Sequence, residues 1–188
     1  MELDKFLTVS PVRGKLVVAS FVPGEWQDHA EPERAKLRKH LSTLDEYADE
    51  FHSSCSHVGI APPFGKAVYG NVGLADRLFD LSQQLINTAI RLDAQEETNM
   101  RAFGRAIRCT PPSRKGGEVK DCTITEGCLE VCRQLKATGF GQKLVFCTSN
   151  ISDYCEGRNL HPTLATDFVA VGLTFATNLP WAVHELFK

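Results

Sequence analysis

The chain has 188 residues, a length that suits one domain. Hydrophobic residues make up 43% and charged residues 23% of it, a balance that excludes a disordered or fibrous protein. The formal net charge of -2 excludes nucleic-acid binding through overall charge, so a nucleic-acid surface would need locally concentrated basic residues.

The first half of the chain predicts one buried strand and two amphipathic helices. Residues 15–22 are mostly apolar and stop at a Pro-Gly pair, as a buried strand does. Apolar residues then recur at helical spacing over residues 26–51, and again over residues 74–92. Between them, residues 52–72 contain prolines and glycines and are predicted to form a long loop.

The second half predicts strands that alternate with helices. Residues 123–126, Thr-Ile-Thr-Glu, have the pattern of a capping box, in which the Thr and Glu side chains satisfy free N–H groups at a helix start. Strands are expected over residues 144–147 and 173–176, and helices over residues 162–171 and 181–187. This alternation predicts an α/β protein with a mostly parallel central sheet flanked by helices.

Acidic and amide side chains follow the predicted strands. Glu25 comes three residues after the first strand, Asp121 precedes the capped helix, and Asn150 and Asp153 follow the strand over residues 144–147. Because a parallel sheet binds ligands beyond the carboxyl ends of its strands, we expect these four side chains to converge there.

Carboxylates held close together repel one another, and a divalent cation removes that conflict. Ligands that are all oxygen favour Mg²⁺ or Mn²⁺ over Zn²⁺. Each residue also has a structural alternative. Glu25 or Asp121 would then start a helix, Asn150 and Asp153 would be turn residues, and Glu126 would act in its capping box.

Three blocks of the sequence, Phe21–His29, Lys120–Glu126 and Val145–Tyr154, resemble the later acidic blocks of PIN-like domains. The resemblance is to the branch with a Pro-x-x-Glu-Trp block and a Thr-x-Asn-x-x-Asp block. It implies a single PIN-like domain over residues 1–188, with a three-layer fold, and a metal-dependent nuclease, most often a ribonuclease.

Residue by residue, the resemblance assigns Glu25 to the family's second acid, Asp121 to the third, and Asn150 with Asp153 to the fourth block. Thr148 or Ser149 would hold a water molecule or a phosphate beside them. In the family's reaction, one or two Mg²⁺ or Mn²⁺ ions activate a water molecule that cleaves the phosphodiester, leaving 3′-hydroxyl and 5′-phosphate ends.

The sequence departs from the family at its beginning. PIN-like domains open with a strand that ends in a metal-binding Asp, whereas residues 1–7 look like the helix that follows that strand. The first strand therefore either precedes this chain or is lost, and Glu2 and Asp4 lack the strand context to replace its acid. An exposed sheet edge would then need a cover, such as a second copy or a partner protein.

A basic segment precedes the third block, with only one acidic residue inside it. Its members, predicted to contact RNA or single-stranded DNA, are Arg101, Arg105, Arg108, Arg114, Lys115 and Lys120. The first three can share one helical face, and the rest lie in or beside a loop. An ordinary solvated face, balanced by the acidic residues 93–97, is the alternative. Phe103 is expected in the core.

Three hypotheses follow from the sequence. The first is a Mg²⁺- or Mn²⁺-dependent ribonuclease with Glu25, Asp121, Asn150 and Asp153 in its site. The second is an inactive PIN-like module that binds RNA or a protein. The third is a thiol enzyme or sensor using Cys147 or Cys155. It has the weakest support because a reactive thiol needs a nearby His or a helix N-terminus, and His161 is the only histidine close to these cysteines in the sequence.

The sequence also indicates where the protein works. Its apolar stretches are much shorter than the ~20 residues that a membrane span needs. Its acidic first residues are unlike a secretory signal, which begins with basic residues. We therefore expect a cytoplasmic protein with reduced cysteines and no membrane partner.

Overall fold

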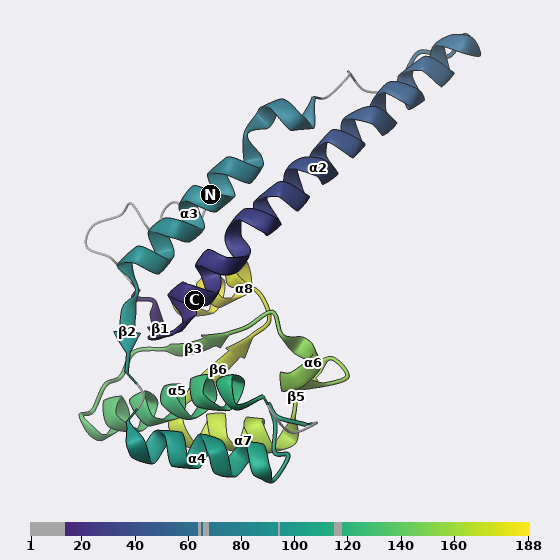
Figure 1. The fold of residues 1–188 in the computed structure, drawn as a ribbon. Helices are drawn as coiled ribbons and strands as arrows, with labels where there is room; N and C mark the ends of the chain where they lie inside the picture. The colour runs from purple at the N-terminus through teal and green to yellow at the C-terminus, as the bar shows by residue number, and fades with distance from the viewer. Residues whose placement is uncertain (1–13, 64, 66–67, 94, 115–117) are drawn as a thin grey trace. The chain divides into compact units, whose positions relative to one another are not determined.

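The computed structural model describes residues 14–188, except residues 64, 66–67, 94 and 115–117 (Figure 1). The chain divides into two compact units. The first unit consists of the residues up to Ser20 together with Ala89–Lys188, and the second unit consists of Phe21–Thr88. The single PIN-like domain over residues 1–188 stays a prediction.

The second unit is built from the long helix α2 (Val22–His57), the 3₁₀ turn η1 (Tyr69–Val72) and the helix α3 (Leu74–Thr88). Helix α2 begins four residues before the span that its apolar periodicity predicts and ends six residues after it. It ends before Gly59, whose φ of 70° suits a glycine, and the N–H of Ile60 donates to the carbonyl of Cys55 at 2.9 Å. The residues that extend its C-terminal end, 52–57, are mostly polar, so they add no apolar stripe that the sequence could reveal.

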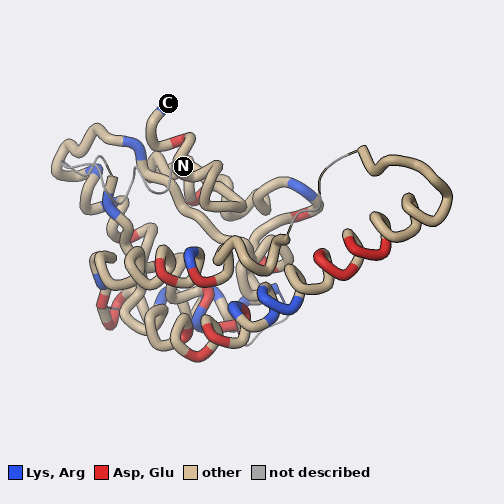
Figure 2. Tube along the Cα trace, turned by 90° about the horizontal axis from the view of Figure 1, so that it is seen from above, with Lys and Arg blue, Asp and Glu red and all other residues tan. Residues whose placement is uncertain are grey.

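Charged residues alternate in blocks along α2, as Figure 2 shows. Near the start of the helix Arg34 donates to Asp76 of α3 at 2.7 Å, and its guanidinium lies 4.6 Å from the centre of the Phe79 ring. Further along, the Asp45 side chain accepts a hydrogen bond from the N–H of Gly70 at 2.8 Å. These contacts join α2 to α3 and to η1.

The described strands of the first unit form three separate pairs. The strand β1 (Val17–Ala19) is parallel to β2 (Ile90–Leu92), and β3 (Leu144–Cys147) is parallel to β6 (Leu173–Ala176). The strands β4 (Cys155–Glu156) and β5 (Asn159–Leu160) form a short antiparallel pair. The predicted strands over residues 144–147 and 173–176 are confirmed, and the mixture of helices and parallel strands confirms the α/β class.

Two other expectations from the sequence were wrong, the end of the helix over residues 74–92 and the single central sheet. Residues 90–92 form β2 rather than the last turn of a helix, because Ile90–Leu92 pairs with β1. The described strands form two-stranded sheets, so their hydrogen bonding does not make one continuous central sheet.

Five helices surround these strands in the described part of the first unit. They are α4 (Glu96–Ile107), α5 (Val119–Ala137), the short α6 (Ile151–Tyr154), α7 (Pro162–Val171) and α8 (Leu179–Phe187). Figure 1 shows α5 and α7 on one side of β3 and β6, and α8 on the other. The core between α5, α7 and the sheet contains Leu129, Phe146, Leu164 and Phe168. No helix among the described residues is long and apolar enough to cross a bilayer.

The two ends of α7 agree with the sequence. The N–H of Thr163 donates to Nδ1 of His161 at 3.3 Å, and Gly172 stops the helix with a φ of 71°. The start of α5 was predicted wrongly. This helix begins at Val119, so Thr123 lies inside it and donates to the carbonyl of Val119 at 2.9 Å instead of forming a capping box.

Candidate functional site

The structure brings together three of the predicted site residues, all in the first unit. Asp121 lies in the first turn of α5, Asn150 precedes α6, and Asp153 lies in α6. The Nδ2 of Asn150 donates to Oδ2 of Asp121 at 3.1 Å and to Oδ2 of Asp153 at 2.7 Å. One amide group therefore joins two carboxylates that lie 32 positions apart in the chain. We refer to Asp121, Asn150 and Asp153 as the carboxylate–amide cluster.

Hydrogen bonds on both sides orient the Asn150 side chain. The Oγ of Ser152 donates to Oδ1 of Asn150 at 2.8 Å, which leaves the NH₂ group facing the two carboxylates. The N–H of Asn150 donates to Oγ1 of Thr148 at 3.1 Å. Thr148 is half-buried and Ser149 is exposed. Thr148 therefore shapes the turn between β3 and α6, while its contact with a phosphate or water stays a prediction.

A buried tyrosine anchors α6 to the start of α5. The hydroxyl of Tyr154 lies 3.1 Å from Oγ1 of Thr125 and donates to the carbonyl of Asp121 at 3.3 Å. Thr125 donates to the same carbonyl at 2.9 Å. Burial raises the pKa of Tyr154 above its ordinary value, so this hydroxyl stays protonated at neutral pH. The backbone beneath the carboxylate–amide cluster is thus fixed by neutral hydrogen bonds.

The chemistry of the carboxylate–amide cluster suits a hard cation. Asp121 and Asp153 would supply carboxylate oxygens, and Asn150 would hold the two side chains together. Mg²⁺ is commonly bound by one or two carboxylates, with water molecules and substrate phosphates completing its shell. Within residues 14–188 and their stated gaps, no group of three or more His, Cys, Asp or Glu side chains is placed to hold a metal ion.

Glu25 belongs to the second unit and lies in the first turn of α2. A carboxylate at this place is stabilised by the partial positive charge of the helix N-terminus. This is the structural alternative for Glu25, and a metal ion shared with Asp121 stays a prediction. The predicted first-strand substitutes Glu2 and Asp4 lie outside the described residues.

The structure differs most from the sequence at Arg105. Its side chain is buried, with 8% of the residue exposed, and it donates to Oε1 of Glu126 at 2.6 Å and to Oδ2 of Asp167 at 2.8 Å. It also donates to the carbonyl of Pro111 at 2.8 Å. Arg105 is therefore the centre of an ion-pair cluster with Glu126 and Asp167, and it does not belong to an exposed basic face.

The physical reason is that Glu126 is itself buried and needs a positive partner. Arg101 is also engaged, because it forms ion pairs with Glu97 and Glu130, each at 2.7 Å. Arg108, Arg114 and Lys120 are exposed, and Lys115 lies outside the described residues. The predicted nucleic-acid surface is thus reduced to residues around the loop between α4 and α5.

Sequence reasoning missed Ser152, Thr125 and Tyr154 as supports of the carboxylate–amide cluster. Ser152 lies two residues after Asn150, and this spacing is a recognisable local signal for a side-chain hydrogen bond. The contact between Thr125 and Tyr154 joins residues 29 positions apart, and no local sequence pattern predicts it.

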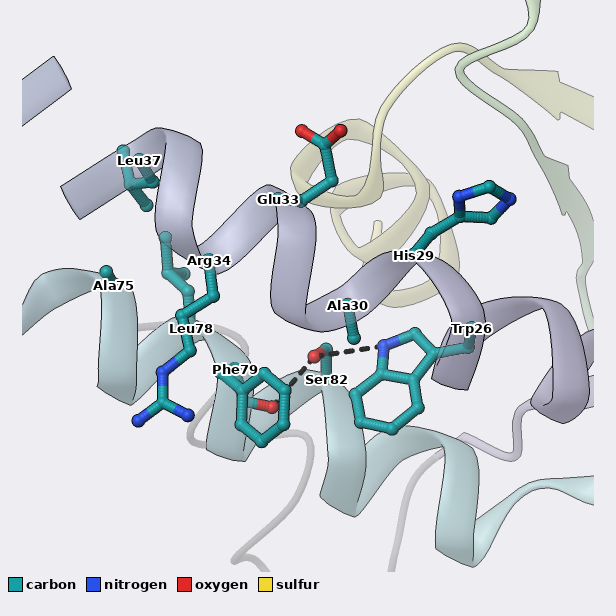
Figure 3. A pocket seen from close by; sticks show the side chains of 10 residues that line it. All are labelled: Trp26, His29, Ala30, Glu33, Arg34, Leu37, Ala75, Leu78, Phe79 and Ser82. Carbon is teal, nitrogen blue, oxygen red and sulfur yellow. Dashed lines mark hydrogen bonds between the residues drawn. The ribbon is translucent and has the colours of Figure 1, made fainter. Parts of the chain in front are cut away.

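A separate pocket lies within the second unit, between α2 and α3 (Figure 3). It has a volume of about 260 Å³ and is lined by Trp26, Leu37, Leu78 and Phe79, among others. The indole N–H of Trp26 donates to Oγ of Ser82 at 3.2 Å. Trp26 of the Phe21–His29 block therefore packs between these helices, and its polar atom is satisfied.

Comparison of the chain with protein-family models, with curated proteins and with solved structures finds no match to any of them.

Proposed function

We propose that the protein is a metal-dependent nuclease, most concretely a ribonuclease that uses Mg²⁺ or Mn²⁺. The observation that carries this proposal is the pair of hydrogen bonds from Asn150 to Asp121 and Asp153. The three residues come from two blocks that resemble the PIN-like family, and they meet beyond the end of β3, where a parallel sheet binds its ligands.

In this proposal Asp121 and Asp153 hold the ion, and Asn150 keeps their carboxylates at a fixed separation. The bound ion would supply an activated water molecule and would stabilise the charge that develops on the phosphate. Arg108, Arg114 and Lys120 would attract the RNA backbone, or that of single-stranded DNA, by charge. A PIN-like three-layer fold and a cytoplasmic location belong to the same proposal. The placement of α8 opposite α5 and α7 supports the layered fold.

Thermal unfolding with Mn²⁺ tests the metal site directly. An ion at a hundred times its dissociation constant stabilises the folded chain by about 2.7 kcal/mol, which would raise Tm by several degrees. We expect this rise in the unsubstituted chain and its loss in Asp121→Asn and Asp153→Asn. Asp28→Asn, which alters an exposed acid of α2, is the matched control and should keep the rise. No rise in the unsubstituted chain would contradict the proposal.

Glu25→Gln separates the two interpretations of that residue. If Glu25 shares the ion with Asp121, the substitution weakens the Mn²⁺-dependent rise in Tm. If Glu25 acts only at the start of α2, the rise is unchanged and the chain loses about 0.3–1 kcal/mol of stability with or without metal.

An inactive module that binds RNA or a protein is the second candidate function. Among described residues, the carboxylate–amide cluster contributes two acids, fewer than the four-block pattern of the family implies. A cleavage assay with labelled RNA distinguishes the two functions. Metal-dependent products with 5′-phosphate ends support the nuclease, whereas salt-sensitive RNA binding without cleavage supports the module.

A further inference from the structure

The arginines of the first unit differ in whether an acidic side chain neutralises their charge. Arg101, Arg105 and Arg133 each form ion pairs with glutamates at 2.6–2.8 Å. Arg114 and Arg158 are exposed, and neither forms an ion pair within the described part of the chain. A guanidinium that no carboxylate neutralises is free to bind a phosphate with two parallel hydrogen bonds.

Arg158 lies in the turn of the hairpin that β4 and β5 form. The register pairs Glu156 with Asn159, so Gly157 and Arg158 are the two residues of the turn. Gly157 has a φ of 63°, as a two-residue turn with glycine in its first position requires. This tight turn holds Arg158 at the exposed end of a short, regular element.

The base of the β4–β5 hairpin adjoins the carboxylate–amide cluster. Asp153 lies in α6, which leads directly into β4. The N–H of His161 donates to the carbonyl of Tyr154 at 2.9 Å and closes the base of the hairpin. A strand advances about 3.3 Å per residue, so the turn lies on the order of 10 Å from Asp153. Arg158 is therefore within a few nucleotides of a phosphate held by the cluster.

The loop between α4 and α5 brings Arg114 to the same region. Pro112 and Ser113, which precede it, are fully buried, and the N–H of Arg114 donates to the carbonyl of Pro112 at 3.1 Å. Burial raises the pKa of the Cys155 thiol in β4, and the positive charge of Arg114 opposes part of this rise, so Arg114 lies near the hairpin. Figure 1 shows the connection between α4 and α5 at the same end of the first unit as α6 and β5.

We propose that Arg158 and Arg114 bind backbone phosphates of a single RNA strand that crosses the carboxylate–amide cluster beside the β4–β5 hairpin. The proposal rests on the proposed function, because the cluster fixes where the scissile phosphate would lie. Arg158 lies outside the basic segment that the sequence predicts, so it is a further contact with the strand. Phosphate contacts of this kind position a strand without reading its bases.

Equilibrium binding of a labelled single-stranded RNA to the full chain tests the proposal. Fluorescence anisotropy in EDTA, over a series of salt concentrations, measures binding without metal-dependent cleavage. Each lost phosphate contact should lower the slope of log K against log salt by about 0.7 for a single strand. We expect this change in Arg158→Gln, and a change of about 1.4 when Arg114→Gln is added, with several-fold weaker binding at low salt.

Arg91→Gln is the matched control, because Arg91 is an exposed arginine of β2, at the other end of the first unit (Figure 1). It should leave the affinity and the slope unchanged, and Arg158→Lys, which keeps the charge, should retain the slope. Circular dichroism confirms that each variant is folded. Unchanged binding in Arg158→Gln, or no measurable binding of RNA by the unsubstituted chain, would overturn the proposal.

The metal test and the RNA test fail independently. If Mn²⁺ does not raise the Tm of the unsubstituted chain but Arg158→Gln still lowers the salt slope, the nuclease is contradicted and Arg158 is an RNA contact of an inactive module. If Mn²⁺ raises Tm but Arg158→Gln binds RNA as Arg91→Gln does, the metal site stands and the role of Arg158 is overturned.

Discussion

Two of the carboxylates of helix α5, those of Glu126 and Asp121, have sharply different surroundings. Glu126 is buried and faces Arg105, which also binds Asp167, so a cation joins that pair of acids. Asp121 lies five positions earlier, is half-buried, and is joined to Asp153 by the neutral amide of Asn150. The comparison shows how burial decides the partner, because a fully buried carboxylate needs a full opposite charge and a partly hydrated one does not.

The two groups of acids also differ in the charge of the side chain that joins them. Burial lowers the pKa of Arg105, but its hydrogen bonds to Asp167 and Glu126 outweigh this and hold the pKa above its usual value. Arg105 therefore stays charged at every accessible pH, and the cluster around it is structural. The amide of Asn150 carries no charge, so Asn150 itself neutralises neither Asp121 nor Asp153.

The largest effect is expected from Arg105→Met, which leaves Glu126 buried without its main partner. We expect the free energy of unfolding to fall by about 3–5 kcal/mol, measured by urea denaturation at pH 7. Arg158→Met, at an exposed arginine, should change it by less than about 0.5 kcal/mol. A loss of stability below about 1 kcal/mol for Arg105→Met would contradict the conclusion that buried Glu126 needs a charged partner.

Asn150→Asp replaces the neutral bridge by a third carboxylate. Repulsion among the three acids and the lost hydrogen bonds should destabilise the chain by about 1–3 kcal/mol at pH 7. Repulsion raises the folded-state pKa of such a carboxyl above its unfolded value, so the deficit relative to the unsubstituted chain should shrink as the pH falls towards 4. Urea denaturation at both pH values measures this, and a deficit that is independent of pH would contradict it.

Added Mn²⁺ sharpens the same experiment. If Asp121 and Asp153 bind the ion, a third carboxylate beside them should strengthen binding, and Mn²⁺ should recover most of the stability lost in Asn150→Asp. Asn159→Asp, at an exposed asparagine of β5, is the control and should show no additional response to Mn²⁺.

Tyr154→Phe removes the hydroxyl beneath the carboxylate–amide cluster and should cost about 1 kcal/mol at pH 7. The pKa of Tyr154 is raised in the folded chain, so the unfolded chain ionises first as the pH passes about 10. The stability that Tyr154 contributes is therefore complete below pH 10 and is lost as the pH rises further. The difference between Tyr154→Phe and the unsubstituted chain should narrow by pH 11, and a constant difference would contradict this.

The smallest effect is expected from Ser152→Ala, which removes the donor to Oδ1 of Asn150. We expect a loss of about 0.5–1 kcal/mol by urea denaturation, because one hydrogen bond at an exposed position is lost. Ser149→Ala alters an exposed serine of the same turn and is the control. Equal effects of the two substitutions would show that Ser152 does not orient the amide.

Elements whose ends are marked by proline, glycine or a change in hydrophobicity were predicted well. The strands β3 and β6 are short apolar runs, and Pro162 with Gly172 marks the two ends of α7. Asp121, Asn150 and Asp153 were also chosen from the sequence, because each follows a strand or starts a helix. The structure places these three together, while their role in metal binding stays a prediction.

Features that depend on contacts distant in the sequence were not predicted. Arg105 has the same helical spacing as exposed arginines, and only the packing of α4 against α5 shows that it faces Glu126. Phe103 has the composition of a core residue, yet Ala102 and Ala106 occupy the contact instead. The strand β2 continues a helical pattern of apolar residues, and its pairing with β1 decides its structure.

Each of the two units contains one of the two tryptophans of the chain. Trp26 lies in α2 beside Phe79, with ring centres 5.4 Å apart, and Trp181 lies in α8 with its indole N–H donating to Glu185 at 3.3 Å. Their fluorescence therefore reports on different parts of the molecule. Replacing either one by phenylalanine gives a chain with a single emitter, and comparing the two denaturation curves shows whether both units melt in one cooperative step.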